Sequence, residues 1–137
     1  MTTQNLMDIL HSGNYSLVVL NNGLHTYSGR GIADLYHLYM HHRELLHGAS
    51  VADKIVGKGA AALMALGGVA DVTTDVISTP ALSLLEGCGI PVSYSKVVAN
   101  IINRKGDGIC PVEHLCSECN TPAECLPLIE QFMSDKN

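Results

Sequence analysis

Four of the five cysteines gather toward the carboxyl end with the spacing C-x5-C-x2-C-x5-C, and they are Cys110, Cys116, Cys119 and Cys125. Thiolates bind zinc or iron–sulfur clusters, and nearby thiols can form a reversible disulfide. The spacing lacks the paired C-x2-C knuckles of a zinc ribbon and differs from that of bacterial ferredoxins. We interpret the cysteines first as packing between helices, with zinc, an iron–sulfur cluster or a Cys116–Cys119 dithiol as alternatives. We expect Cys125 to be buried in the last helix, apart from that pair.

A second group of polar residues stands where the stretch ADKIVGKG opens a predicted helix. Asp53 would cap this helix, and Lys54 and Lys58 would lie one turn apart on one face. Lysines near a helix start oppose its dipole unless an anion is close, and Gly57 and Gly59 each cost about 1 kcal/mol relative to Ala. These features predict an anion site, although a surface lysine pair and glycines needed for packing explain them equally well.

Two more predicted helix starts carry polar side chains. Ser78 and Thr79 precede Pro80, which is typical of a side-chain cap followed by proline at the first helical position. Cys110 follows a glycine-rich turn at another start, where the helix dipole favours a thiolate, although simple packing explains it as well. Glu113 is most simply a residue that satisfies a backbone donor of its own helix.

The apolar pattern predicts the elements that position these groups. They are a helix over 3–11, a hairpin over 15–29 turning at Asn22-Gly23, helices over 32–46 and 55–66, a strand over 72–77, a helix from 78 to 87 or 89, a strand over 91–98, a short helix from 110, and a last helix from a capping box at 121–124 to 133. The strand, helix and strand between 72 and 98 predict a right-handed crossover with parallel strands. We therefore expect one α/β domain over 1–137, with a helical segment at about 110–135.

The composition limits the partners. Hydrophobic residues make up 47% of the 137 residues, charged residues 15%, and the net charge is −5 without any run of Lys or Arg. Such a chain has no electrostatic basis for binding duplex nucleic acid or an anionic membrane surface. It shows neither a signal peptide nor eighteen continuous apolar residues, so we expect a cytoplasmic protein. Self-association into a homo-oligomer is compatible with this composition.

Several stretches resemble a family of small proteins of unknown function, DUF1893. They are ADKIVGKGAAALMALGGV, DVISTPALSLLEGCGI, SKVV, INRKGDG and ICPVE, and with the preceding hairpin and helix they cover nearly the whole chain through Glu113. The resemblance implies the cytidine deaminase-like fold, a three-layer α-β-α sheet with mixed strand order, followed here by a helical C-terminal extension.

The chain departs from the zinc enzymes of that fold at their metal site. Zinc deaminases carry [HC]-x-E at one core helix start and P-C-x-x-C at the next. The corresponding positions here are Asp53-Lys54 with Val56, and Ser78-Thr79-Pro80-Ala81. The resemblance therefore implies that the zinc ligands and the catalytic Glu are missing, which argues against zinc-dependent hydrolytic deamination.

What the resemblance leaves is a pocket between two adjacent helix starts, suited to a small anionic ligand of the nucleotide or ADP-ribose class. The expected ligand-binding residues are Asp53, Lys54, Gly57, Lys58, Ser78, Thr79, Cys110 and Glu113. The residues do not decide whether there is catalysis, for which Asp53 as nucleophile or base, and Lys54 or Cys110 as nucleophile, are candidates. The alternatives are a metal- or redox-responsive protein that uses the C-terminal cysteines, and a non-enzymatic homo-oligomeric interaction protein.

Overall fold

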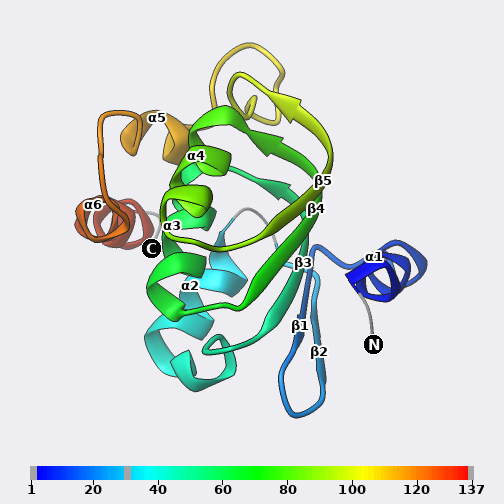
Figure 1. Ribbon diagram of the computed structural model, residues 1–137. Helices are drawn as coiled ribbons and strands as arrows, with labels where there is room; N and C mark the ends of the chain where they lie inside the picture. The colour runs from blue at the N-terminus through cyan, green and yellow to red at the C-terminus, as the bar shows by residue number, and fades with distance from the viewer. Residues whose placement is uncertain (1–2, 30–31, 136–137) are drawn as a thin grey trace.

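The computed structural model describes residues 3–29 and 32–135 as a sheet covered by helices on both faces (Figure 1). The sheet has five strands in the order β2-β1-β3-β4-β5. The strands are β1 (Leu17–Leu20), β2 (Leu24–Tyr27), β3 (Ser50–Val56), β4 (Asp71–Ser78) and β5 (Val92–Val98). β1 pairs antiparallel with both β2 and β3, whereas β3, β4 and β5 are parallel, so the sheet is mixed.

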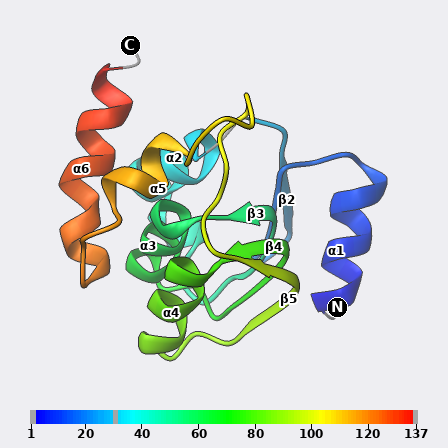
Figure 2. The same ribbon diagram turned by 90° about the horizontal axis from the view of Figure 1, so that it is seen from above.

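The helices form two outer layers. They are α1 (Thr3–Ser12), α2 (Ala33–His41), α3 (Lys58–Gly67), α4 (Thr79–Gly87), α5 (Pro111–Leu115) and α6 (Pro122–Asp135), with a 3-10 turn, η1 (Arg43–Leu45), after α2. α1 packs on β1, β3 and β4 from one side, while α2, α3 and α4 cover the other side and α6 packs outside α3 (Figures 1 and 2). The predicted three-layer α-β-α architecture with a helical C-terminal segment is confirmed.

Two apolar cores hold these layers together. The smaller one lies under α1, where Leu6, Met7 and Leu10 pack on Val18 and Ala52. The larger one lies between the sheet and α2, α3 and α4, and its fully buried members include Val51, Leu63, Met64, Ile77 and Leu85. The central strands are therefore covered on both faces.

The predicted hairpin and crossover are both present. Leu20 pairs with Leu24, and Asn22 and Gly23 adopt the positive φ values of 51° and 128° that a tight turn requires. β4, α4 and β5 form the predicted parallel crossover, with Ser78 as the N-cap and Pro80 in the second helical position instead of the first. At the start of α6, Thr121 accepts a hydrogen bond from the backbone N–H of Glu124, as the capping box predicts.

The prediction of a helix over residues 55–66 was wrong at its start. Residues Ser50–Val56 instead form the strand β3, and α3 begins only at Lys58. Both faces of β3 are covered, so its sequence SVADKIV lacks the alternation that marks a half-buried strand. Neighbouring strands on both sides supply its backbone partners, which overrides the helix-forming tendency of Ala and Lys.

The helix predicted over residues 32–46 is also shorter. α2 ends at His41, and a separate 3-10 turn over Arg43–Leu45 follows. His42 between them has φ −141° and ψ 47°, a conformation outside the helical region.

A carboxylate between two helix starts

The starts of α3 and α4 lie next to each other because each helix directly follows one of two paired parallel strands. Val56 of β3 pairs with Ile77 of β4, so both strands end at the same edge of the sheet. Gly57 is the N-cap of α3, and Ser78 is the N-cap of α4, where its hydroxyl oxygen accepts a hydrogen bond from the N–H of Ala81 at 3.2 Å. Two helix ends with positive partial charge therefore converge on one point.

The carboxylate of Glu113, from α5, occupies this point. Its Oε1 accepts hydrogen bonds from the backbone N–H of Lys58 at 2.7 Å and from the hydroxyl of Ser78 at 2.9 Å. Its Oε2 accepts a hydrogen bond from the backbone N–H of Ile101. One side chain thus joins α3, α4 and the segment after β5 to α5. The expectation that Glu113 serves its own helix start was wrong, because its partners come from other elements.

The charge of this carboxylate is stabilised by donors and not by a nearby cation. Glu113 is only 2% exposed, and none of the ion pairs found among residues 3–29 and 32–135 involves it. A buried carboxylate is costly unless its oxygens accept several hydrogen bonds, and helix starts provide such donors. The site therefore accommodates an anionic oxygen group.

Gly57 and Gly59 make room for α5 against the start of α3. A Cβ on Gly57 would lie 3.3 Å from Oε1 of Glu113 and 3.2 Å from the side chain of Ile101. A Cβ on Gly59 would lie 2.3 Å from Cγ1 of Val112, which is a clash. The two glycines therefore allow close packing of α5, which agrees with the packing interpretation.

The Lys58 side chain points to the loop between α5 and α6, residues 116–121. Its ammonium donates hydrogen bonds to the carbonyl oxygens of Cys119 at 2.5 Å and Ser117 at 3.3 Å, and the residue is only 8% exposed. A small hollow of about 210 Å³ opens beside it, lined by Lys58, Pro80, Ser83, Leu84, Cys119 and Asn120. The hollow therefore lies between α4 and this loop.

Three of the residues expected at the site have other roles. Lys54 lies in β3, not on a helix, and donates a hydrogen bond to the side chain of Asn14 at 3.1 Å. The hydroxyl of Thr79 donates to the carbonyl oxygen of Val98 at 3.3 Å. Cys110 is the N-cap residue of α5 without a side-chain capping bond, and its backbone N–H donates to Ile101. The structure thus brings together Gly57, Lys58, Ser78 and Glu113 from the expected set.

Asp53 lies within β3, between Leu17 of β1 and Thr74 of β4, and does not cap a helix. Its carboxyl group accepts a long hydrogen bond of 3.4 Å from the N–H of Ile55. Burial raises the pKa of Asp53 from 3.8 to about 7, against a smaller lowering by the backbone N–H groups of Ile55 and Lys54. With this pKa the carboxyl group gains and loses its proton near neutral pH.

The C-terminal cysteines differ in their pKa values. A hydrogen bond with Cys125 lowers the pKa of Cys116, whereas burial raises the pKa of Cys119 to about 11. Cys125 is buried, as predicted. Within residues 3–29 and 32–135, no three His, Cys, Asp or Glu side chains are arranged to hold one metal ion.

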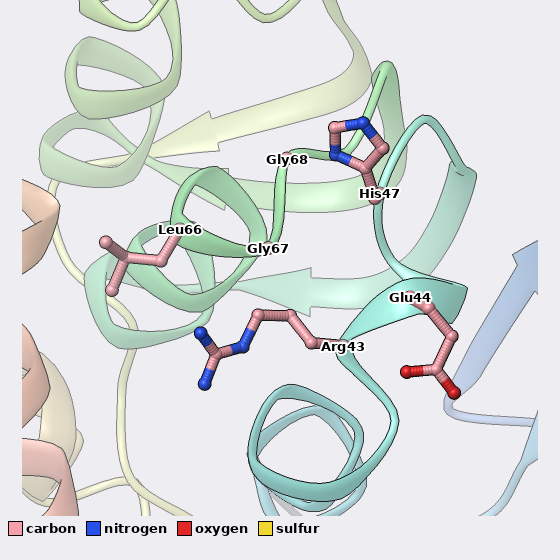
Figure 3. A pocket seen from close by; sticks show the side chains of 6 residues that line it. All are labelled: Arg43, Glu44, His47, Leu66, Gly67 and Gly68. Atoms are coloured by element: carbon pink, nitrogen blue, oxygen red, sulfur yellow. The ribbon is translucent and has the colours of Figure 1, made fainter.

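A wider, open depression of about 630 Å³ lies at the far end of α3, among Arg43, Glu44, His47, Leu66, Gly67 and Gly68 (Figure 3). There Arg43 and Glu44 point away from each other. The Arg43 guanidinium stacks on the ring of Tyr39 at 4.0 Å, and its Nε donates to the carbonyl oxygen of that residue. Because the carbonyl end of a helix carries negative partial charge, this depression does not repeat the anion site.

Sequence reasoning missed the donors that complete the site. No sequence pattern predicts that the backbone N–H of Ile101 donates to Glu113, because every residue except proline has such a donor. Ser83 and Asn120, which line the hollow, come from a helix face and a turn whose meeting depends on the tertiary fold. The glycines at 57 and 59 were the one local sign of close approach there.

The fold and site define an α/β domain with a five-stranded mixed sheet whose two adjacent helix starts are closed by an internal carboxylate. A family model described as Domain of unknown function (DUF1893) matches residues 5–133, and the chain belongs to this family.

The crystal structure of a DUF1893 family protein from Thermotoga maritima is similar to this chain, with a TM-score of 0.86 and 26% sequence identity. The match covers 93% of this chain and 87% of that one. No match was found among curated proteins. Among the described helices, none has the length and apolar character needed to cross a membrane.

Proposed function

We propose that this domain binds a small anionic ligand of the nucleotide or ADP-ribose class at the adjacent starts of α3 and α4. The observation that supports this is the Glu113 carboxylate, which accepts hydrogen bonds from Lys58 and Ser78 there. In the proposal Glu113 is an internal substitute for the ligand's anionic group, and binding requires its displacement. Phosphate oxygens use the same donors as carboxylate oxygens at helix starts.

The construction of α5 supports such a displacement. α5 contains only the five residues Pro111–Leu115, and turns precede and follow it. The hollow of about 210 Å³ next to Lys58 has room for a phosphate-sized group, but it is smaller than the usual pocket for a whole nucleotide. The remainder of the ligand would therefore lie where α5 now packs.

We further propose that the domain is a cytidine deaminase-like fold that has lost its metal chemistry. The start of α3 carries Gly57, Lys58 and Gly59, and the start of α4 carries Ser78, Thr79 and Pro80. None of these side chains is a preferred zinc ligand, and none is the Glu that moves protons in zinc deaminases. Hydrolytic deamination by that mechanism is therefore not part of the proposal.

The composition supports a small molecule as the partner. A net charge of −5 without a basic run supports a small ligand over a polyanionic partner such as duplex nucleic acid. We propose a cytoplasmic protein.

Calorimetric titration with inorganic phosphate, ADP and ADP-ribose tests the ligand proposal. We expect Glu113→Ala to bind at least one of them at least about tenfold more tightly than the unmodified chain, because a like charge is removed from the site. Glu118→Ala is the matched control, since Glu118 is an exposed carboxylate in the neighbouring loop and should leave the affinity unchanged. If neither the unmodified chain nor Glu113→Ala binds any of the three compounds, the proposal is wrong.

A further inference from the structure

Three histidines gather at the carboxyl end of α2, apart from the starts of α3 and α4. His37 lies on α2, His41 is the last residue of this helix, and His42 is its C-cap residue. The ring centroids of His37 and His41 are 4.8 Å apart, and those of His37 and His42 are 5.6 Å apart. All three residues are exposed, so ions in solution reach the rings directly. We call these residues the histidine cluster.

The end of α2 brings the third ring into the cluster. His37 and His41 are four residues apart, and residues with this spacing are neighbours on one face of a helix. If the helix continued, His42 would lie on a different face, because each residue turns the helix by about 100°. Its φ of −141° and ψ of 47° end the helix instead, and its ring lies beside that of His37. His37 is therefore the shared member of two imidazole pairs.

The ring nitrogens of the helical pair are available to a ligand. Within residues 3–29 and 32–135, the ring hydrogen bonds and ion pairs of histidines belong to His11 and His42. Oε1 of Glu44 lies 3.8 Å from Nδ1 of His42, which is longer than a hydrogen bond. In metal sites a carboxylate behind a histidine ligand orients its ring and increases its basicity. Glu44 is in position for this role.

We propose that the histidine cluster binds one Zn²⁺ ion, with His37 and His41 as the first two ligands and His42 as the third. Two histidines at positions i and i+4 of a helix are a known zinc-binding arrangement. Imidazole nitrogen suits zinc, whereas magnesium and calcium prefer oxygen ligands. The three rings do not surround one point as they stand, and no three-residue metal group is formed in the described part of the chain. Rotation of the exposed His42 side chain completes the set, and water fills the fourth position.

The ion connects α2 to the turn that follows it. Arg43 and Glu44 of η1 directly follow the cluster and line the open depression at the far end of α3 (Figure 3). Zinc bound to His42 and to the last turn of α2 therefore fixes one wall of this depression. The site is separate from the proposed ligand site, so the two proposals can fail independently.

Zinc titration of the unmodified chain against a chromophoric chelator tests this proposal. We expect one bound equivalent that a large excess of Mg²⁺ does not displace. His37→Gln should weaken zinc binding at least about tenfold, because His37 belongs to both imidazole pairs and even a residue behind a ligand contributes about tenfold or more to metal affinity. His114→Gln is the matched control, since His114 is an exposed histidine on α5 and should leave the affinity unchanged.

Two further measurements separate the histidines from the cysteines and from effects on folding. Co²⁺ in place of zinc should give an absorption spectrum without thiolate charge-transfer bands, because the proposed ligands are imidazoles. In proton NMR spectra of the unmodified chain, zinc should shift the ring signals of His37 and His41 and leave those of His114 in place. This second readout needs no variant to fold.

Three results would overturn the proposal. The first is no zinc binding to the unmodified chain, and the second is equal zinc affinity of His37→Gln and His114→Gln. The third is a cobalt complex with thiolate bands that persists in His37→Gln, which would place the ion at the cysteines.

Discussion

The backbone N–H of Lys58, the first residue of α3, donates a hydrogen bond of 2.7 Å to Oε1 of Glu113, a residue 55 positions further along the chain. This bond connects a helix start in the centre of the domain to the short C-terminal helix α5. Since Ser78 donates to the same oxygen, the two central helices and α5 share one buried acceptor. The stability of the domain should therefore respond strongly to this single side chain.

Glu113→Ala should lower the free energy of unfolding by about 2–4 kcal/mol, because it leaves buried donors of Lys58, Ser78 and Ile101 without their acceptor. Urea denaturation measures the change. Glu118→Ala removes an exposed carboxylate nearby and should stay within about 0.5 kcal/mol of the unmodified chain. Equal losses in the two variants would contradict a special role for Glu113.

Acetate or phosphate should partly restore the stability of Glu113→Ala, because the vacated site retains its donors for an anionic oxygen group. The melting temperature of this variant should rise with anion concentration at constant ionic strength. The melting temperature of the unmodified chain should change little, since its site is already filled. Chloride at equal ionic strength serves as the control, and an equal response to chloride would sink this prediction.

Gly59→Ala should destabilise the protein, although alanine favours a helix by about 1 kcal/mol over glycine. The added Cβ would lie 2.3 Å from Cγ1 of Val112, and overpacking of this kind costs about 1–3 kcal/mol. The clash should therefore exceed the gain in helix propensity and push α5 outward. At Gly87 of α4 nothing lies within 4 Å of an added Cβ, so Gly87→Ala should be neutral or slightly stabilising. Chemical denaturation of both variants compares the two glycines.

Asp53 should make the protein less stable as the pH rises from about 4 to 7. Its pKa in the folded protein is about 7, above the ordinary 3.8, so the folded protein holds a proton that the unfolded chain has lost in this range. The stability it contributes is fully present below the lower pKa and is lost as the pH rises through the higher one. Each pKa unit corresponds to about 1.4 kcal/mol.

Asp53→Asn should remove this slope and raise the free energy of unfolding near pH 7. Denaturation curves at several pH values measure it, and Asp107→Asn, at an exposed loop position, is the control. A pH profile of Asp53→Asn that matches the unmodified chain would show that Asp53 is not the group responsible.

Cys125→Ala should raise the pKa of Cys116, because it removes the thiol hydrogen bond that lowers this pKa most. Cys125→Ser keeps a donor at the same position and should retain more of the lowering. The ultraviolet absorbance of the thiolate, followed against pH and corrected with Cys116→Ser, gives the value. An identical pKa of Cys116 in the alanine and serine variants would rule out the hydrogen bond as the cause.

Local sequence determined much of this protein because the signals involved act over a few residues. The turn at Asn22-Gly23 needs positive φ values, Ser78 caps the helix that it precedes, and the pattern of apolar residues marks α1, α4 and α6. The layered α/β architecture follows from the order of such elements. Similarly, Lys58, Ser78 and Glu113 could be selected as polar residues near helix starts.

The tertiary structure decided the rest, because it depends on which distant segments meet. Local sequence does not predict the strand β3, because its backbone partners come from β1 and β4 on either side. Asp53 and Lys54 therefore lie in the sheet and not at a helix start. The partners of Glu113 likewise come from separate elements. A hydrogen bond between residues far apart in the chain leaves no periodic signal in the sequence, so only the packing of the helices on the sheet reveals it.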